Sequence, residues 1–85
     1  MIEIRVKKSH ELYYGIVAIL ESWLNTRNIK FDCCNVKDIY YDNEEYDVVV
    51  YKIGSVDITL AKNIVEEFSD IVPVLITNKD LIKLF

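Results

Sequence analysis

The feature that most constrains the fold is an apolar run from Tyr46 to Ile53, with the sequence Tyr-Asp-Val-Val-Val-Tyr-Lys-Ile. Three consecutive valines favour an extended backbone, because a side chain branched at Cβ fits a pleated sheet better than a helix. The run is apolar on both alternations, which is typical of a strand covered on both faces. Gly54-Ser55 follows and ends it. We therefore predict that residues 46–53 form the central strand of a small α/β domain.

The composition bounds the class of protein. The chain has 85 residues, 52% of them apolar and 28% charged, with two glycines and one proline. This is typical of a globular domain with little room for linkers, and we expect residues 1–85 to form a single domain. The net charge of −4 argues against nucleic-acid binding, because that affinity rests on cations that neutralise phosphates. No apolar stretch approaches the ~20 residues of a bilayer-spanning helix, so we expect no membrane contact.

The cysteines carry no signature of a functional site. Cys33 and Cys34 are adjacent and are the only two in the chain. Neighbouring cysteines close no useful loop, and they lack the Cys-x-x-Cys spacing of redox motifs. With a single histidine they are too few for a metal site, and no set of nucleophile, base and acid is visible. We therefore expect a cytoplasmic protein with reduced thiols and without a metal site or catalytic residues. These observations argue against an enzyme.

Residue patterns predict the other elements of secondary structure. Ile2–Lys7 alternates apolar and charged side chains, as in a strand with one exposed face. Pro73 lacks an amide donor, so the last strand is expected at a sheet edge or beginning near this residue. In chain order we expect a strand at 2–7, a helix at 9–27 capped by Ser9, strands at 29–36 and 46–53, a helix from Ser55 or Asp57 to 68, a strand at 71–77 and a final helical turn at 81–85.

The connection at 37–45 decides between two folds. If it crosses over, four parallel strands in the order 2-1-3-4 form a shortened flavodoxin-like fold with helices on both faces of the sheet. If it turns back at Asp42-Asn43, a pair that tolerates positive φ, strands 2 and 3 are antiparallel, as in a ferredoxin-like sandwich with both helices on one face. The apolar last two strands favour the parallel sheet, which is our prediction. The alternation at 2–7 and the Asp42-Asn43 pair favour the alternative.

A resemblance also favours the parallel sheet. Residues 29–55, IKFDCCNVKDIYYDNEEYDVVVYKIGS, resemble the middle of flavodoxin-like proteins, in which a second strand leads through an acidic connection to Tyr-Asp-Val-Val-Val and a Gly-Ser turn. The resemblance covers about a third of the chain and implies that fold. The Gly/Ser/Thr-rich loop that binds the flavin phosphate in this family is replaced here by residues 7–10, Lys-Lys-Ser-His, so no cofactor is expected.

The segment 7–10 is the strongest candidate for a binding site. Two lysines, a hydroxyl and an imidazole at a helix N-terminus suit a phosphate or carboxylate, because unpaired amides and the helix dipole attract anions. In the parallel sheet, Gly54-Ser55 opens the second helix beside this segment, at the crevice where open α/β sheets bind ligands. The alternative is that these residues are a helix cap and solvated surface. The predicted site for a small anion or phosphoryl group consists of Lys7, Lys8, Ser9, His10, Gly54 and Ser55.

The tyrosines and the C-terminal segment favour contacts between proteins. Six tyrosines are many for this length, and tyrosine is enriched at interfaces. The apolar residues at 81–85 are expected either to fold over a sheet edge or to dock against a partner, and a small core favours homodimerisation. We therefore expect a non-enzymatic interaction or regulatory module that binds a protein partner or a second copy. Anion binding is the alternative function.

Overall fold

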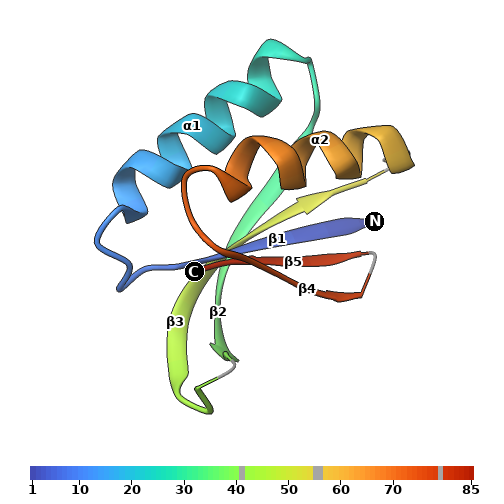
Figure 1. Cartoon of the computed structure of the whole chain (residues 1–85). Coiled ribbons are helices and arrows are strands. Elements are labelled where there is room, and N and C mark those ends of the chain that lie inside the picture. The colour runs from blue at the N-terminus through green and yellow to red at the C-terminus, as the bar shows by residue number, and fades with distance from the viewer. Residues whose placement is uncertain (41, 55–56, 79) are drawn as a thin grey trace.

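The fold consists of a mixed sheet of five strands and two helices (Figure 1). The computed structural model describes residues 1–40, 42–54, 57–78 and 80–85. The strand order is β2-β3-β1-β5-β4, in which β1 and β5 are parallel and the other neighbours are antiparallel. The elements in chain order are β1 (Ile2–Lys7), α1 (Tyr13–Thr26), β2 (Phe31–Ile39), β3 (Glu45–Ile53), α2 (Ile58–Ser69), β4 (Val74–Asn78) and β5 (Leu81–Leu84).

The predicted flavodoxin-like sheet of four parallel strands is wrong. β3 is antiparallel to both of its neighbours, β2 and β1. The two helices lie on the same face of the sheet (Figure 1), and Leu20 of α1 and Phe68 of α2 join one buried core. The antiparallel β2–β3 pair and the one-sided helices match the alternative fold that the sequence left open. That fold has four strands, however, and this sheet has a fifth.

The β2–β3 connection turns back because of Asp42 and Asn43. Asn43 has a φ of 61°, a left-handed conformation that asparagine tolerates. The Asp42 carboxylate accepts a hydrogen bond from the Glu44 amide at 3.1 Å, and the Tyr40 amide donates to the Glu44 carbonyl at 3.3 Å. The residues on either side of this turn therefore continue the two strands of a hairpin instead of crossing over the sheet.

The apolar run at residues 46–53 belongs to β3. This strand is interior to the sheet, but the central strand is β1 and not β3 as predicted. Val49 and Tyr51 pack in the core beneath the helices, whereas Val48 and Val50 belong to a second cluster on the opposite face. That face is covered by the hairpin itself, whose buried Tyr40 completes the second cluster. A strand buried on both faces thus does not require helices on both faces.

The two helices begin differently from each other. α1 begins at Tyr13, after the turns at residues 8–12, and Ser9 does not cap it. Instead the His10 imidazole Nδ1 accepts a hydrogen bond from the Leu12 amide at 3.0 Å. α2 is capped by Asp57, one of the two expected residues, whose carboxylate accepts a hydrogen bond from the α2 amide of residue 60 at 2.8 Å. The other, Ser55, lies outside the described residues.

The C-terminal segment forms strand β5 instead of the predicted helical turn. Ile82 and Leu84 alternate into the main core, and Lys83 between them belongs to the opposite face. β5 lies between β1 and β4, so the segment is interior to the sheet rather than folded over its edge. β4 lies at an edge and begins directly after Pro73, which confirms both expectations for this proline.

Candidate functional site

The strand register separates the two halves of the predicted anion site. Lys7 ends β1, whereas Ile53, the residue before Gly54, pairs with Ile2 at the other end of β1. Five residue steps of ~3.4 Å place these ends about 17 Å apart. The segment 7–10 and Gly54 therefore lie at opposite ends of the sheet and do not share a crevice. The parallel sheet that would have joined them is not formed.

Backbone amides before α1 are used within the chain. The Lys8 amide donates to the Asp47 carbonyl at 2.9 Å, and the Tyr13 amide donates to the His10 carbonyl at 3.0 Å. This end of the helix thus offers fewer free donors to an anion than the sequence suggests. Anion binding by the remaining groups, including the Ser9 hydroxyl, stays a prediction.

Lys7 contacts aromatic rings. Its ammonium lies 4.3 Å from the ring centroid of Tyr46, 5.1 Å from that of Tyr40 and 5.7 Å from that of Phe85. A cation within ~6 Å of a ring face is attracted by the ring quadrupole. These contacts join the end of β1 to the hairpin and to the C-terminus, and they direct the Lys7 charge away from the predicted anion site.

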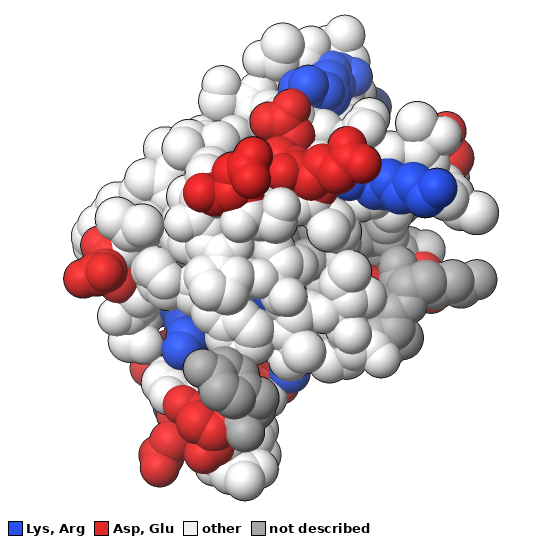
Figure 2. Space-filling model, viewed as in Figure 1, with Lys and Arg blue, Asp and Glu red and all other residues white. Residues whose placement is uncertain are grey.

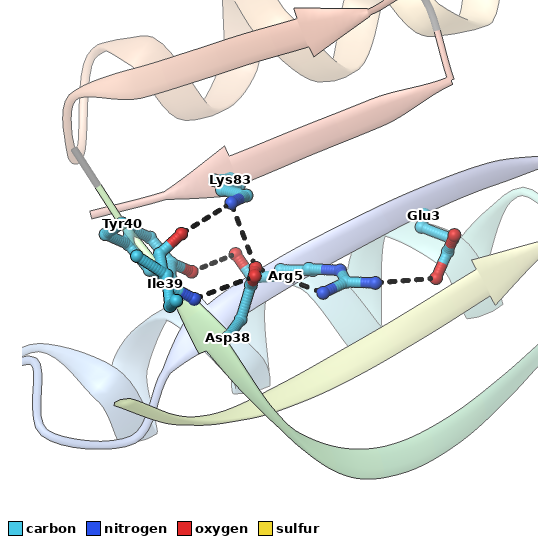
Figure 3. A network of polar contacts seen from close by, with 6 residues as sticks. All are labelled: Glu3, Arg5, Asp38, Ile39, Tyr40 and Lys83. Atoms are coloured by element: carbon cyan, nitrogen blue, oxygen red, sulfur yellow. Dashed lines mark hydrogen bonds and ion pairs between the residues drawn. The ribbon is translucent and has the colours of Figure 1, made fainter. Parts of the chain in front are cut away.

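A charged cluster ties the hairpin to the sheet (Figure 3). Asp38 Oδ2 lies 3.0 Å from the Arg5 guanidinium and 3.0 Å from Lys83 Nζ. Lys83 is only 7% exposed and also donates to the Ile39 carbonyl at 2.9 Å. The Tyr40 hydroxyl donates to the Arg5 carbonyl at 3.4 Å. The cluster therefore connects β1, β2 and β5 on the face opposite the helices, and we call it the Asp38 cluster.

The pKa shifts in the Asp38 cluster follow from these contacts. Burial by itself raises the pKa of the Asp38 carboxyl, but Lys83 and Arg5 outweigh it and hold that pKa below its usual value. Burial, followed by the nearby Asp38 carboxylate, raises the pKa of the Tyr40 hydroxyl. Asp38 is therefore an anion and Tyr40 a neutral donor at neutral pH. Because two cations of the same chain already engage the Asp38 carboxylate, the cluster suits a structural role.

Acid is expected to destabilise the fold through Asp38. Its folded-state pKa lies below the ~3.9 of an unfolded chain, so the folded state binds fewer protons. This stabilisation is complete above about pH 5 and is lost as the pH falls through the folded-state pKa. Urea unfolding at neutral pH and at about pH 3 measures the loss. In Asp38→Asn, the free energy of unfolding is expected to differ less between these two pH values than in the wild type. A variant that loses as much stability in acid as the wild type would contradict the assignment.

The adjacent cysteines lie on opposite faces of β2. Cys33 pairs with Tyr51 on the helix side, and Cys34 packs against the second cluster on the other side. Both thiols are free. Burial, followed by the nearby Glu21 carboxylate, raises the pKa of the Cys33 thiol, so it is less reactive than an ordinary cysteine at neutral pH. The two thiols therefore do not form a redox pair in this arrangement.

The solvent side of α1 is an uncharged, partly apolar surface. Glu21 is the only charged residue among the 14 of this helix, and it accepts a hydrogen bond from the Tyr51 hydroxyl at 3.1 Å. Figure 2 shows acidic side chains gathered over α2 and uncharged atoms over most of α1. We call this exposed surface the α1 face. It consists of Leu12, Tyr14, Gly15, Ala18, Ile19 and Ser22.

The α1 face combines exposed apolar side chains with small residues. Tyr14 is 84% exposed and Ile19 is 47% exposed. A Cβ atom at Gly15 would meet no atom within 4 Å, so no neighbour within the described chain requires this glycine. A shallow hollow of about 430 Å³ runs along the helix and is lined by Ala18, Ile19, Ser22, Trp23, Thr26 and Arg27. The α1 face is therefore the candidate interaction site.

The sequence predicted neither the α1 face nor the Asp38 cluster. The α1 face could have been predicted, because a 14-residue helix with a single charge is visible in the sequence, although helical periodicity identifies only the buried stripe. No sequence pattern predicts the Asp38 cluster. Asp38 is 33 residues after Arg5 and 45 residues before Lys83, and only the bent hairpin brings them together.

Comparisons with known proteins do not assign a family. No family model, curated protein or solved structure matches this chain. In the described ranges, neither helix is long and apolar enough to cross a bilayer. The same residues contain no group of three His, Cys, Asp or Glu side chains that could hold a metal ion. Inference about function therefore depends on the geometry of the described surfaces.

Proposed function

We propose that this protein is a small cytoplasmic interaction module without enzymatic activity, which self-associates through the α1 face. The observation that carries the proposal is the uncharged, solvent-exposed side of α1 with Tyr14 and Ile19 on it. Contiguous exposed apolar surface on a soluble domain commonly marks an interaction site. The free thiols of Cys33 and Cys34 suit a reducing compartment.

A second copy is the partner that the charges favour. A two-fold contact sets a surface against itself, so any exposed charge there meets the same charge. The six residues of the α1 face carry no charge, and Arg27 lies at the far end of the hollow beside them, whereas the net charge of −4 opposes close contact between most other surfaces of two copies. Gly15, Ala18 and Ser22 allow a second helix to approach closely, since interaxial distance depends on side-chain size at the contact.

The self-contact is expected to be weak. α1 has 14 residues and is therefore about 21 Å long at ~1.5 Å per residue. A contact between two such helices buries less than the ~1,600 Å² of a standard stable interface. We expect a dissociation constant in the micromolar range or weaker, and a single substitution on the α1 face should have a large effect on it.

Sedimentation equilibrium of the wild-type chain tests the proposal. The average mass is expected to rise with concentration from the 10.0 kDa of the monomer toward twice that value. Added salt is expected to have little effect, because the six residues of the α1 face carry no charge. A mass that stays at 10.0 kDa up to millimolar concentration would contradict the proposal. Dissociation by salt would assign the contact to charged surfaces instead.

A further inference from the structure

A groove runs between α2 and the β4 side of the sheet. Its volume is about 560 Å³, which lies in the range of ligand and peptide sites. Ile58 contributes the most exposed apolar side chain of α2 and is 76% exposed. The apolar lining consists of Ile2, Ile58, Ala61, Val65, Ile76 and Ile82.

β4 is the edge strand beside this groove, and it carries no charge. Its sequence is Val-Leu-Ile-Thr-Asn, whereas β2 at the opposite edge carries Asp32, Lys37 and Asp38. Charged side chains commonly protect an edge strand against pairing with another chain. Of the two edges, β4 is therefore the one that is open to an added strand.

The backbone of β4 directs hydrogen-bonding groups outward. The Pro73 carbonyl accepts a hydrogen bond from the Phe85 amide at 3.1 Å, which directs it toward β5. In an antiparallel pair the N–H and C=O groups of successive residues alternate between the two sides. Val74 and Ile76 therefore direct theirs away from β5, where an added strand would pair with them.

The rim of the groove is acidic. Among the described residues that line it, three are acidic and one is basic, which gives a formal charge of 1 − 3 = −2. The four are Asp57, Lys62, Glu66 and Asp80. A ligand with lysine or arginine side chains would meet complementary charge here, which favours its association and its orientation.

We propose that this groove binds an extended, basic and apolar segment of a partner protein, which adds to β4 as a further strand of the sheet. The segment's backbone pairs with Val74 and Ile76. Its alternate side chains point into the groove, apolar in the middle and cationic at the two ends, where they face Asp57 and Glu66. The groove lies apart from the α1 face, so this binding does not depend on self-association.

The test uses the whole chain and a capped peptide as long as β4, with lysine at its first and last positions and isoleucine at its centre, so that these three side chains lie on one face. Titration is followed by amide NMR shifts and calorimetry. We expect saturable binding, with the largest shifts in β4 and along α2. Absence of shifts at millimolar peptide, or shifts confined to other elements, would overturn the proposal.

Two control peptides separate strand addition from charge. A peptide with the same side chains but methylated alternate amides cannot form two edge hydrogen bonds, and about tenfold weaker binding is expected. A peptide with glutamate in place of lysine is also expected to bind at least about tenfold more weakly. Equal binding of the methylated peptide would overturn strand addition, and equal binding of the glutamate peptide would overturn the role of the acidic rim.

A matched pair of variants separates the groove from the α1 face. Ile58→Lys removes an apolar side chain and adds a cation at the groove, so at least about tenfold weaker peptide binding is expected. Ile58 is largely exposed, so the substitution spares the core. Ile19→Lys makes the same change on α1 and is expected to leave peptide binding unchanged. Equal losses in both variants would contradict the separate groove.

Discussion

Asp38→Asn is expected to lower the free energy of unfolding by about 2 kcal/mol, between the small effect of an exposed ion pair and the ~3–5 kcal/mol for removing one partner of a fully buried pair. The Asp38 carboxylate is the counterion of both Arg5 and Lys83, and its side chain is 17% exposed. The substitution keeps the shape of the side chain but leaves two cations facing each other. Urea unfolding at neutral pH measures the change.

An exposed pair in the same hairpin provides the matched control. Lys37 Nζ lies 2.9 Å from Asp47 Oδ1, but these side chains are 64% and 67% exposed. Solvent screens such a pair, so Asp47→Asn is expected to change the stability little. If the Asp38 and Asp47 substitutions had equal effects, the Asp38 cluster would be no more than a surface ion pair.

A double variant distinguishes two causes of this loss of stability: the lost attraction between Asp38 and its cations, and the cost of burying Lys83 without a carboxylate partner. Arg5 keeps its ion pair with Glu3 at 3.4 Å, so Lys83 is the cation that loses its carboxylate partner. Lys83→Met in the Asp38→Asn background replaces this cation with an apolar side chain of similar length. Part of the lost stability is expected to return, because an uncompensated buried charge costs more than a well-packed apolar replacement. A further loss of stability in the double variant would show that Lys83 stabilises the fold mainly through its bond to the Ile39 carbonyl.

Ile19→Lys is expected to weaken self-association by at least about 30-fold. Each copy loses on the order of 1 kcal/mol from a side chain that is already half exposed, and the two losses together correspond to this factor. Two lysines then meet across the two-fold contact, which adds like-charge repulsion. Sedimentation equilibrium is expected to give the 10.0 kDa monomer at concentrations where the wild type associates.

Ile58→Lys on α2 is the control for this effect. It replaces the same residue type with the same cation on an even more exposed site. Because it lies outside the α1 face, self-association is expected to match that of the wild type. Equal weakening by Ile19→Lys and Ile58→Lys would mean that net charge, rather than the α1 face, controls association.

The elements of this fold are more predictable from the sequence than their arrangement. Alternation identified β1, the run at 46–53 identified most of β3, and Asp57 and Pro73 marked the starts of α2 and β4. The predicted arrangement was wrong at β3, because a strand buried on both faces suggested a sheet with helices on both faces. The hairpin that covers Val48 and Val50 is a tertiary feature, and local patterns do not encode where a strand bends.

The candidate site shows the same division. The sequence placed residues 7–10 at the start of the first helix, but α1 begins only at Tyr13, and their link to Gly54 depended on a parallel pairing that does not form. The apolar residues at 81, 82, 84 and 85 follow helical spacing, which suggested a helical turn, but pairing with β1 and β4 makes residues 81–84 a strand. An interaction surface is harder still to predict from the sequence, because the absence of charged residues is a weaker signal than a motif of specific residues.

An intermolecular distance measurement tests the self-association through α1 most directly. In a mixed sample of isotope-labelled and unlabelled chains, filtered NOE spectra detect only contacts between copies. We expect such contacts from the methyl groups of Leu12, Ala18 and Ile19 to α1 of the other copy. At a concentration where the mass has doubled, contacts that arise instead from β2, β4 or α2 would contradict the proposed interface.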